Sequence, residues 1–446
     1  MIMDAPRPLT VGPGPPLSGE LRLPGDKSIT HRAYLLALLA PGETRVRGAN
    51  PGEDCAGTLA CARELGVQVE AVDGGVRLSQ HGLHAPDGVL DCGNSGSTLR
   101  MLAGVLASQL FDCTLDGDAS LRRRPLGRII EPLRRMGATL SAADSDRRPP
   151  LTVRGARLRG ITAVLPVASA QVASAIEFAA LAAEGETVIE IPGPARDHTE
   201  RMLGAVGVAL EIEPLAHGGR RVRVRGGAAV APFRSVEVPG DFSAAAFALA
   251  AAATRRGARV RACGVSLNPT RLGLLDVMRA MGATVTVEPG GESGGEPFGD
   301  IVVEGAELRA FDVPQEWVAR LIDEVPAWVI LAANSRGVSR LRGAAELRVK
   351  ESDRIATLAR ALEALGMPVE EHADGLSITG APIRGGRIEA AGDHRIAMAF
   401  ATLGTLANAA ITVDDARAIA TSYPAFERHM AALGARIMPA PLEHGR

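Results

Sequence analysis

The chain has 446 residues, 46% of them hydrophobic, a length that favours two domains which each bury their own core. Lys plus Arg number 49 against 51 for Asp plus Glu, and aromatic residues make up 3%, so the composition argues against a nucleic-acid partner. Five cysteines without a Cys-x-x-Cys pair, no signal-peptide order at the N-terminus and no apolar run of spanning length predict a cytoplasmic protein without a membrane partner.

A short turn signature recurs along the chain: an apolar residue, Gly, two further residues and another apolar residue. Gly directly after an apolar helical face is typical of a left-handed helix C-cap, and the alternation after it predicts a strand. The six copies are, in order, LGVQV at 65, MGATL at 136, VGVAL at 206, MGATV at 281, LGMPV at 365 and LGARI at 433. Their nearly even spacing indicates six repeated units.

Each unit also carries a predicted helix that begins after Gly, Ser, Asp or Asn and continues through small apolar residues. These stretches are, in order, PGDKSITHRAYLLALLA from 24, DCGNSGSTLRMLAGVLA from 91, LPVASAQVASAIEFAALAA from 165, VPGDFSAAAFALAAAA from 238, LIDEVPAWVILAANSRG from 321 and GDHRIAMAFATLGTLA from 392. Six units with helices and short strands predict an α/β protein.

The motif PGD-x-S heads the first and the fourth of these helices, at 24 and 239, which indicates three units duplicated. We therefore expect one half over 23–239 and a discontinuous second half made of 1–22 plus 240–446. The residues before the first crossing are expected to add a strand to the second half.

Basic side chains gather at or near the predicted helix starts, although the chain is slightly acidic overall. A helix N-terminus presents unpaired N–H groups and a partial positive charge, so it binds phosphate or carboxylate. The cations are Lys27, Arg32, Arg100, Arg124, Arg196, Lys350, Arg354 and Arg395. The serines at these starts, Ser28, Ser95, Ser169 and Ser243, have the alternative interpretation of plain N-caps. Lys350 and Arg354 are expected on one helical face.

Two carboxylates, Asp323 in LIDEVP and Glu351 in VKESDR, are candidate acid–base groups, and His394 in GDHRIAM is a third titratable candidate. Each also has a purely structural interpretation as a cap or as the partner of a neighbouring cation. The chain contains no P-loop, H-E-x-x-H or G-x-S-x-G motif, which argues against the corresponding chemistries. We expect a site without metal or cofactor, lined with cations and a few carboxylates.

Nine stretches, collinear over nearly the whole chain, resemble the 5-enolpyruvylshikimate-3-phosphate synthase family. They are PGDKSITHR, GNSGSTLR, RRRPLGR, ASAQVASA, RDHTERM, NPTRLGLL, LIDEVP, ELRVKESDR and GDHRIAM. The resemblance implies a two-domain inside-out α/β barrel of six βαβαββ units, three per domain, with helix N-termini facing the interdomain cleft. It also implies transfer of the enolpyruvyl group of phosphoenolpyruvate to the 5-hydroxyl of shikimate 3-phosphate, by a monomer whose partners are these two small molecules.

The resemblance also assigns site residues by motif. Shikimate 3-phosphate would be bound by Lys27, Ser28, Arg32, Ser169, Gln171, Arg196, Asp323 and Lys350. Phosphoenolpyruvate would be bound by Lys27, Asn94, Gly96, Arg124, Gln171, Arg354 and Arg395. The catalytic set would be Asp323, Glu351, Lys27, Lys350 and His394, in which Asp323 is the base near the 5-hydroxyl while Glu351 and Lys350 transfer protons at the methylene carbon and the bridging oxygen.

The chain departs from the family pattern at two positions, since Ala170 stands where some members have a second serine and Thr421 where some have a lysine. Three alternatives remain. A UDP-N-acetylglucosamine enolpyruvyltransferase usually carries a reactive cysteine before an Arg-Pro, but GDASLRR before Arg124 contains none. An inactive phosphometabolite-binding paralogue would lack Asp323 and Glu351, and an RNA-terminal cyclase would have a basic surface.

Overall fold

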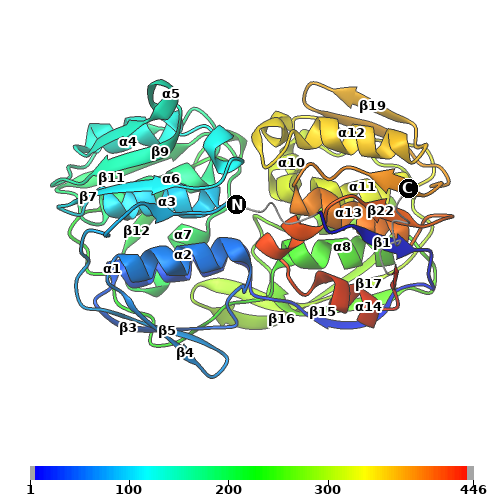
Figure 1. Ribbon diagram of the computed structural model, residues 1–446, viewed down its shortest axis with the longest axis horizontal. Coiled ribbons are helices and arrows are strands. Elements are labelled where there is room, and N and C mark those ends of the chain that lie inside the picture. Colours follow the sequence, from blue (N-terminus) through cyan, green and yellow to red (C-terminus); the bar gives the residue numbers. More distant parts are fainter. Residues whose placement is uncertain (1–5, 439–446) are drawn as a thin grey trace, which may run out of the picture. The chain divides into compact units, whose positions relative to one another are not determined.

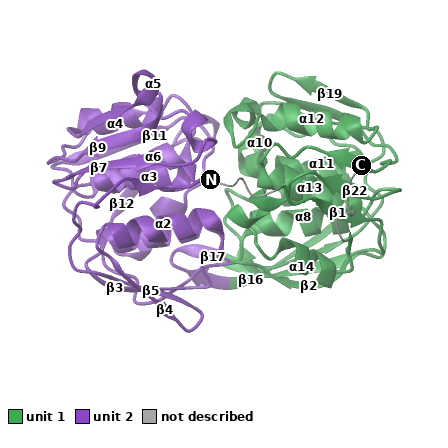
Figure 2. Cartoon of the chain, in the orientation of Figure 1, with its two compact units in different colours: residues 1–24, 240–290, 298–446 green, residues 25–239, 291–297 purple. Residues whose placement is uncertain are grey.

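The structure is a computed structural model that describes residues 6–438, and the chain divides into two compact units (Figures 1 and 2). Unit 1 comprises residues 1–24, 240–290 and 298–446, and unit 2 comprises residues 25–239 and 291–297. The chain therefore passes between the units four times. The segment 291–297 is a hairpin tip that the sequence pattern did not assign to the half over 23–239.

Unit 2 carries three four-stranded sheets, in the orders β14-β3-β5-β4, β6-β7-β9-β8 and β10-β11-β13-β12. Its strands are β3 (Gly42–Arg47), β4 (Gln68–Val72), β5 (Gly75–Gln80), β6 (Leu90–Asp91), β7 (Asp112–Asp116), β8 (Thr139–Ala142), β9 (Arg148–Arg154), β10 (Thr162–Val164), β11 (Glu186–Ile191), β12 (Leu210–Pro214), β13 (Arg220–Arg225) and β14 (Val236–Glu237). Its helices are α1 (Lys27–Leu39), α2 (Glu53–Glu64), α3 (Gly96–Leu106), α4 (Gly127–Met136), α5 (Ala143–Asp146), α6 (Ala170–Ala180) and α7 (His198–Ala205). Each sheet has one parallel edge pair and two antiparallel pairs.

Unit 1 also carries three sheets, in the orders β16-β17-β15-β2, β18-β20-β19 and β21-β22-β1-β23. Its strands are β1 (Leu9–Gly12), β2 (Ser18–Arg22), β15 (Arg259–Ser266), β16 (Thr284–Ser293), β17 (Glu296–Glu304), β18 (Val338–Leu341), β19 (Val369–His372), β20 (Gly375–Thr379), β21 (Gly386–Ile388), β22 (Ile411–Val413) and β23 (Arg436–Met438). Its helices are α8 (Phe242–Ala253), α9 (Gly273–Met281), α10 (Gln315–Leu321), α11 (Val325–Ala333), α12 (Arg354–Ala364), α13 (His394–Gly404) and α14 (Phe426–Ala432). The residues before the first crossing supply β1 and β2, two strands where the sequence predicted one.

The local signals in the sequence are confirmed. All six predicted turn glycines have positive φ, between 75° at Gly366 and 119° at Gly137, a region that favours glycine because it lacks Cβ. The six predicted small-residue helices are α1, α3, α6, α8, α11 and α13.

Two local predictions were wrong. Lys350 and Arg354 do not share a helical face, because a short 3-10 helix ends at Val349 and α12 begins at Arg354, capped by Asp353. Ser28 and Ser243 lie inside α1 and α8 and are not their caps.

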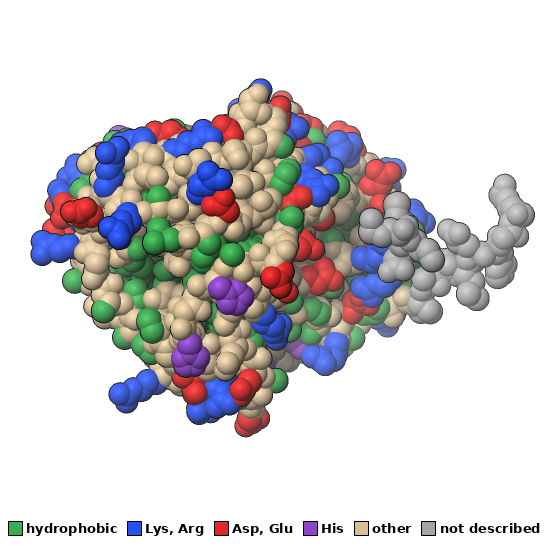
Figure 3. Space-filling view, turned by 60° about the vertical axis from the view of Figure 1, so that its left-hand side comes forward, with side chains coloured by type: hydrophobic (Ala, Val, Ile, Leu, Met, Phe, Trp, Pro, Cys, Tyr) green, Lys and Arg blue, Asp and Glu red, His purple; other side chains and the backbone are tan. Residues whose placement is uncertain are grey.

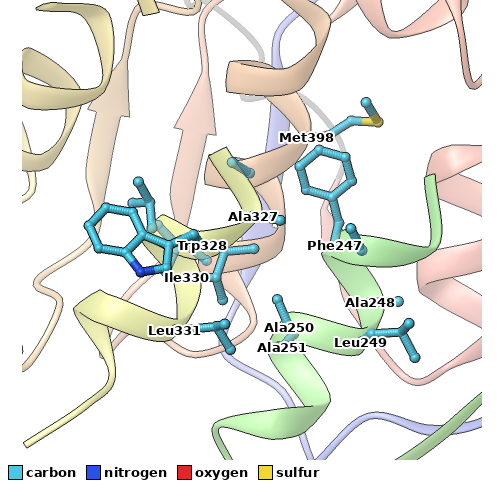
Figure 4. Packing of buried hydrophobic residues seen from close by; sticks show 14 of the residues in the cluster. Phe247, Ala248, Leu249, Ala250, Ala251, Ala327, Trp328, Ile330, Leu331 and Met398 are labelled. Carbon is cyan, nitrogen blue, oxygen red and sulfur yellow. The ribbon is translucent and has the colours of Figure 1, made fainter. Parts of the chain in front are cut away.

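Each unit has its own apolar core. Every residue of α8 is buried, and its alanines allow α11 and α13 to pack closely against it. Figure 4 shows Phe247 of α8 beside Met398 of α13, with Trp328 on the neighbouring α11. Of these core helices, α13 begins with the candidate residues His394 and Arg395, and Asp323 lies in the turn before α11.

The surface carries mixed charge. On the face in Figure 3, Lys and Arg side chains alternate with Asp and Glu side chains and do not form one basic patch. No helix within residues 6–438 is both long and apolar enough to cross a bilayer. The five cysteines are free thiols, four of them buried.

Candidate active site

In unit 2, the start of α3 brings together three of the residues assigned to phosphoenolpyruvate. Ser95 caps the helix by accepting from the Thr98 N–H, so the preceding Asn94 and the first helical residue, Gly96, lie at the N-terminus. Arg124 donates from Nη2 to Asn94 Oδ1 at 2.7 Å. A Cβ on Gly96 would lie 3.1 Å from Arg124 Nη1, which places the guanidinium directly over this glycine.

Gln171, near the start of α6, is linked to the same helix α3. Its Oε1 accepts from Arg100 Nη1 at 2.7 Å, and its Nε2 donates to Ser97 Oγ at 2.9 Å. Arg100 was noted in the sequence as a cation but was not assigned to the site. Its position in the GNSGSTLR motif, one turn after Gly96, was the available signal.

Lys27, the first residue of α1, forms an ion pair with a carboxylate that the sequence analysis missed. Its Nζ lies 2.8 Å from Oδ2 of Asp54 in the first turn of α2, and both side chains are largely buried. Asp54 directs the ammonium toward the α2 side of the helix start. No pattern in the sequence marked Asp54, because it pairs with a residue of another segment.

The remaining assigned residues of unit 2 surround Ser28 and α7. Arg196 Nη1 lies 3.5 Å from Ser28 Oγ. Arg32 is buried, and it donates to Thr199 Oγ1 at 2.7 Å, to Ser174 Oγ at 2.9 Å and to the Ser28 carbonyl at 3.0 Å. Three of its five N–H donors are therefore already engaged.

Ser169 is the N-cap residue of α6, and its side chain makes no capping hydrogen bond. Ala170 follows it as the first residue of the helix. The hydroxyl therefore lies at the helix start without the local bond that a plain N-cap role requires.

A buried hydrogen-bond chain supports the start of α3. His31 Nδ1 is hydrogen-bonded to Thr58 Oγ1 at 2.7 Å, Thr58 Oγ1 to Thr98 Oγ1 at 2.7 Å, and Thr98 Oγ1 donates to Ser95 Oγ at 2.7 Å. Burial, with the nearby charges of Lys27 and Arg32, lowers the pKa of His31 to about 3. The ring is therefore neutral at physiological pH.

In unit 1, three cations converge on Asp323, which lies in a 3-10 turn between α10 and α11. Its Oδ1 is 3.4 Å from Lys350 Nζ and 3.5 Å from Arg354 Nη1, and its carbonyl accepts from Arg395 Nη1 at 2.9 Å. Lys350 thus reaches Asp323 from an extended residue and Arg354 from a helix start.

Arg354 joins the candidate carboxylates of unit 1. It donates from Nη2 to Glu351 Oε2 at 2.7 Å and from Nε to Asp393 Oδ2 at 2.8 Å, and its side chain is 1% exposed. Burial alone would lower the pKa of Arg354, but Asp393, Glu351 and Asp323 raise it above its ordinary value. Asp393 also caps α13, in which His394 is the buried first residue.

A second buried network adjoins this cluster and was not predicted. Arg271 donates to Ser243 Oγ at 2.7 Å, and Ser243 in turn donates to Oε1 of Glu324, the residue after Asp323. Glu324 Oε1 lies 3.9 Å from Arg395 Nη1. The network therefore braces the turn that carries Asp323.

The structure thus gathers the assigned residues into two clusters, one in each unit. The cluster of unit 2 presents hydrogen-bond donors and cations at the starts of α1, α3 and α6. The cluster of unit 1 holds the carboxylates Asp323 and Glu351 beside three cations. Among the described residues, no group of three or more His, Cys, Asp and Glu side chains is placed to hold a metal ion.

A family model described as EPSP synthase (3-phosphoshikimate 1-carboxyvinyltransferase) matches residues 11–430. The chain belongs to this family. The 3-phosphoshikimate 1-carboxyvinyltransferase of Acidithiobacillus ferrooxidans is 47% identical over 421 residues, which cover 93% of this chain and 95% of that protein. The enzyme of the same name from Xanthomonas campestris pv. campestris is 46% identical over 422 residues, 93% and 94% of the two chains.

Solved structures of the same family also match the fold of this chain. An EPSP synthase structure from Acinetobacter baumannii matches with a TM-score of 0.85 at 40% identity, covering 97% of this chain and all of that one. The mixed α/β fold predicted from the sequence is therefore confirmed at that level. The family match also disfavours the UDP-N-acetylglucosamine and paralogue alternatives.

Proposed function

We propose that this chain transfers the enolpyruvyl group of phosphoenolpyruvate to the 5-hydroxyl of shikimate 3-phosphate, with release of phosphate, as a step of the shikimate route to aromatic amino acids. The observation that carries this conclusion is the family match over residues 11–430, together with the retention of Asp323 and Glu351 beside three cations. No metal or cofactor enters the proposed chemistry.

In the proposed binding scheme, each substrate anion meets cations at helix starts. Shikimate 3-phosphate is held by Lys27, Ser28, Arg32, Ser169, Gln171, Arg196, Asp323 and Lys350. Phosphoenolpyruvate is held by Lys27, Asn94, Gly96, Arg124, Gln171, Arg354 and Arg395. Guanidinium groups suit this task because they bind carboxylate and phosphate in a planar, bidentate manner. A backbone group or Arg196 takes the place of the hydroxyl missing at Ala170.

The proposed reaction is an addition followed by an elimination. Asp323 accepts the proton of the 5-hydroxyl as its oxygen attacks C2 of phosphoenolpyruvate, while a proton is added to the methylene carbon. A proton then leaves the resulting methyl group and phosphate departs from the tetrahedral intermediate. Glu351 and Lys350 transfer these protons, supported by Arg354, which binds Glu351 at 2.7 Å. Lys27 and His394 complete the proposed catalytic set.

The finer architecture belongs to the same proposal: an inside-out barrel of six βαβαββ units, three per half, with helix N-termini facing the cleft between halves over 1–22 plus 240–446 and over 23–239. Six sheets, three in each unit, support it. We also propose a cytoplasmic monomer, and the five free thiols suit a reducing compartment.

The test is a phosphate-release assay with phosphoenolpyruvate and either shikimate 3-phosphate or UDP-N-acetylglucosamine as acceptor. We expect phosphate release when shikimate 3-phosphate is the acceptor and none when UDP-N-acetylglucosamine is the acceptor. The proposal would be contradicted if only the nucleotide sugar supported release, or if neither of the two acceptors did.

A further inference from the structure

The loop between β11 and α7 carries Arg196. One arginine from another strand forms hydrogen bonds to the backbone of this loop. Residues 192–197 form this loop, outside regular secondary structure. Arg220, the first residue of β13, donates from Nη1 to the Ala195 carbonyl at 2.8 Å and from Nη2 to the Arg196 carbonyl at 2.9 Å. Its Nε donates to Glu200 Oε1 at 2.7 Å, in the first turn of α7.

The register of the sheet explains why Arg220 reaches all three groups. Arg220 is paired with Ile191, the last residue of β11, so its side chain starts where the loop leaves the sheet. The same guanidinium therefore ties the strand end, the loop backbone and the helix start. Arg220 is 13% exposed and Glu200 3%, so water competes little for these bonds.

From this geometry we propose that Arg220 is a positioning residue for shikimate 3-phosphate, acting through the backbone of Arg196. The inference rests on the proposed role of Arg196 in binding that substrate. A fixed loop presents the Arg196 side chain beside Ser28, where their contact is 3.5 Å, before the substrate arrives. Without Arg220 the loop must be ordered when the substrate binds, and this cost weakens binding.

The planar arrangement of several N–H donors in one guanidinium group is the property that positions the loop. Its planar donors bind two successive carbonyls and one carboxylate together, a pattern that the compact ammonium of lysine does not reproduce. Arg220→Lys keeps the positive charge beside Glu200 and should still lose the positioning. Arg220→Met removes both the charge and the donors.

The chain offers a matched control in the next residue of the same strand. Arg221 donates to Glu190 at 2.7 Å and to Glu213 at 2.8 Å, contacts that tie neighbouring strands and do not involve the loop. Arg221→Met therefore removes two ion pairs from the same sheet without releasing Arg196.

The experiment measures the dissociation constant of shikimate 3-phosphate by isothermal titration calorimetry, and kcat and KM for phosphoenolpyruvate at saturating acceptor. Circular dichroism establishes that each variant is folded. We expect Arg220→Met and Arg220→Lys to weaken shikimate 3-phosphate binding by about 10-fold or more, with kcat and the phosphoenolpyruvate KM within about twofold. Arg221→Met should bind as the wild type does.

Arg196→Met separates this inference from the function on which it rests. If Arg196→Met loses affinity and the Arg220 variants do not, the positioning role alone is wrong. If Arg196→Met binds normally, its proposed role and this inference both fail. Equal losses in the Arg220 and Arg221 variants, parallel changes in the phosphoenolpyruvate KM, or failure of both Arg220 variants to fold would show a merely structural role and overturn the inference.

Discussion

Acidification from pH 8 to pH 5 is expected to weaken the folding of unit 2 through one side chain, His31. The ring is fully buried in α1, and its pKa is lowered to about 3 by burial and by the charges of Lys27 and Arg32, against a smaller opposing effect of Asp26. In the unfolded chain a histidine titrates near pH 6.5. Between these two values the unfolded state binds more protons than the folded state, so stability falls as pH falls through 6.5 toward 3.

The size of this loss of stability follows from the pH range between the two pKa values. Each pH unit below the unfolded pKa costs up to about 1.4 kcal/mol, and pH 5 lies about 1.5 units below it, so His31 alone should remove about 2 kcal/mol of unfolding free energy relative to pH 8. His31→Asn has no titrating ring and should lack this part of the pH dependence. Its lost packing against Thr58 lowers stability by an amount that does not change with pH.

The assay is urea unfolding followed by circular dichroism at several pH values between 5 and 8, for the wild type, His31→Asn and the exposed control His84→Asn. The stability gap between wild type and His31→Asn should narrow by about 2 kcal/mol on going to pH 5, whereas the His84→Asn profile should parallel the wild type. A gap that stays constant across this range would refute the reasoning, because His31 would then be equally protonated in both states.

Two further predictions concern the reaction. Asp323→Ala and Glu351→Ala should each lower kcat by about 10² or more while the far-ultraviolet circular dichroism stays unchanged, and full turnover in either variant would remove that residue from the proposed catalytic set. Gly96→Ala should weaken competitive inhibition by glyphosate, a slightly longer anion than phosphoenolpyruvate, far more than it raises the KM for phosphoenolpyruvate. The added methyl group would lie beside Arg100 and Arg124 and take up the space that the longer anion needs. Steady-state inhibition kinetics test the second prediction, and equal losses for both ligands would contradict it.

Features encoded by neighbouring residues were predictable from the sequence. A glycine such as Gly137 after an apolar helical face, with φ of 119°, needs only local sterics to end a helix. The starts of α3 and α13 were likewise visible as GNSGST and GDHRIAM. The assigned cations lie at or near such starts because helix position and charge can be read from the same short motif.

Pairings between distant segments could not be predicted. Asp54 binds Lys27 across 27 residues, and Arg100 binds Gln171 across 71 residues, and no local pattern indicates that these residues pair. The same holds for Glu296 in the hairpin tip. Its buried Oε1 lies 2.7 Å from Nδ1 of the buried His198 in α7. Charge alone also misplaced Lys350 and Arg354 on one helix, because the cap formed by Asp353 starts α12 only at Arg354.

The repeated PGD-x-S motif shows how the two halves share a scaffold and differ in chemistry. The Asp26 N–H donates to the Pro239 carbonyl at 2.7 Å, and the Asp241 N–H donates to the Pro24 carbonyl at 2.8 Å, so each copy supplies the acceptor for the other where the chain passes between units. The glycine of the first copy also packs closely against another segment, since a Cβ on Gly25 would lie 2.1 Å from the Gly48 carbonyl oxygen.

The aspartates of the two copies then cap their helices, Asp26 by accepting from the Ile29 N–H and Asp241 from the Ser243 N–H. Gly25 and the two aspartates are thus explained by close packing and by capping, and they would be required in an inactive duplicate as well. Only the next position differs in kind, with Lys27 in one copy and the buried Phe242 in the other. In this motif Gly and Asp serve the scaffold, whereas the position that breaks the repeat carries Lys27, which is assigned to both substrates.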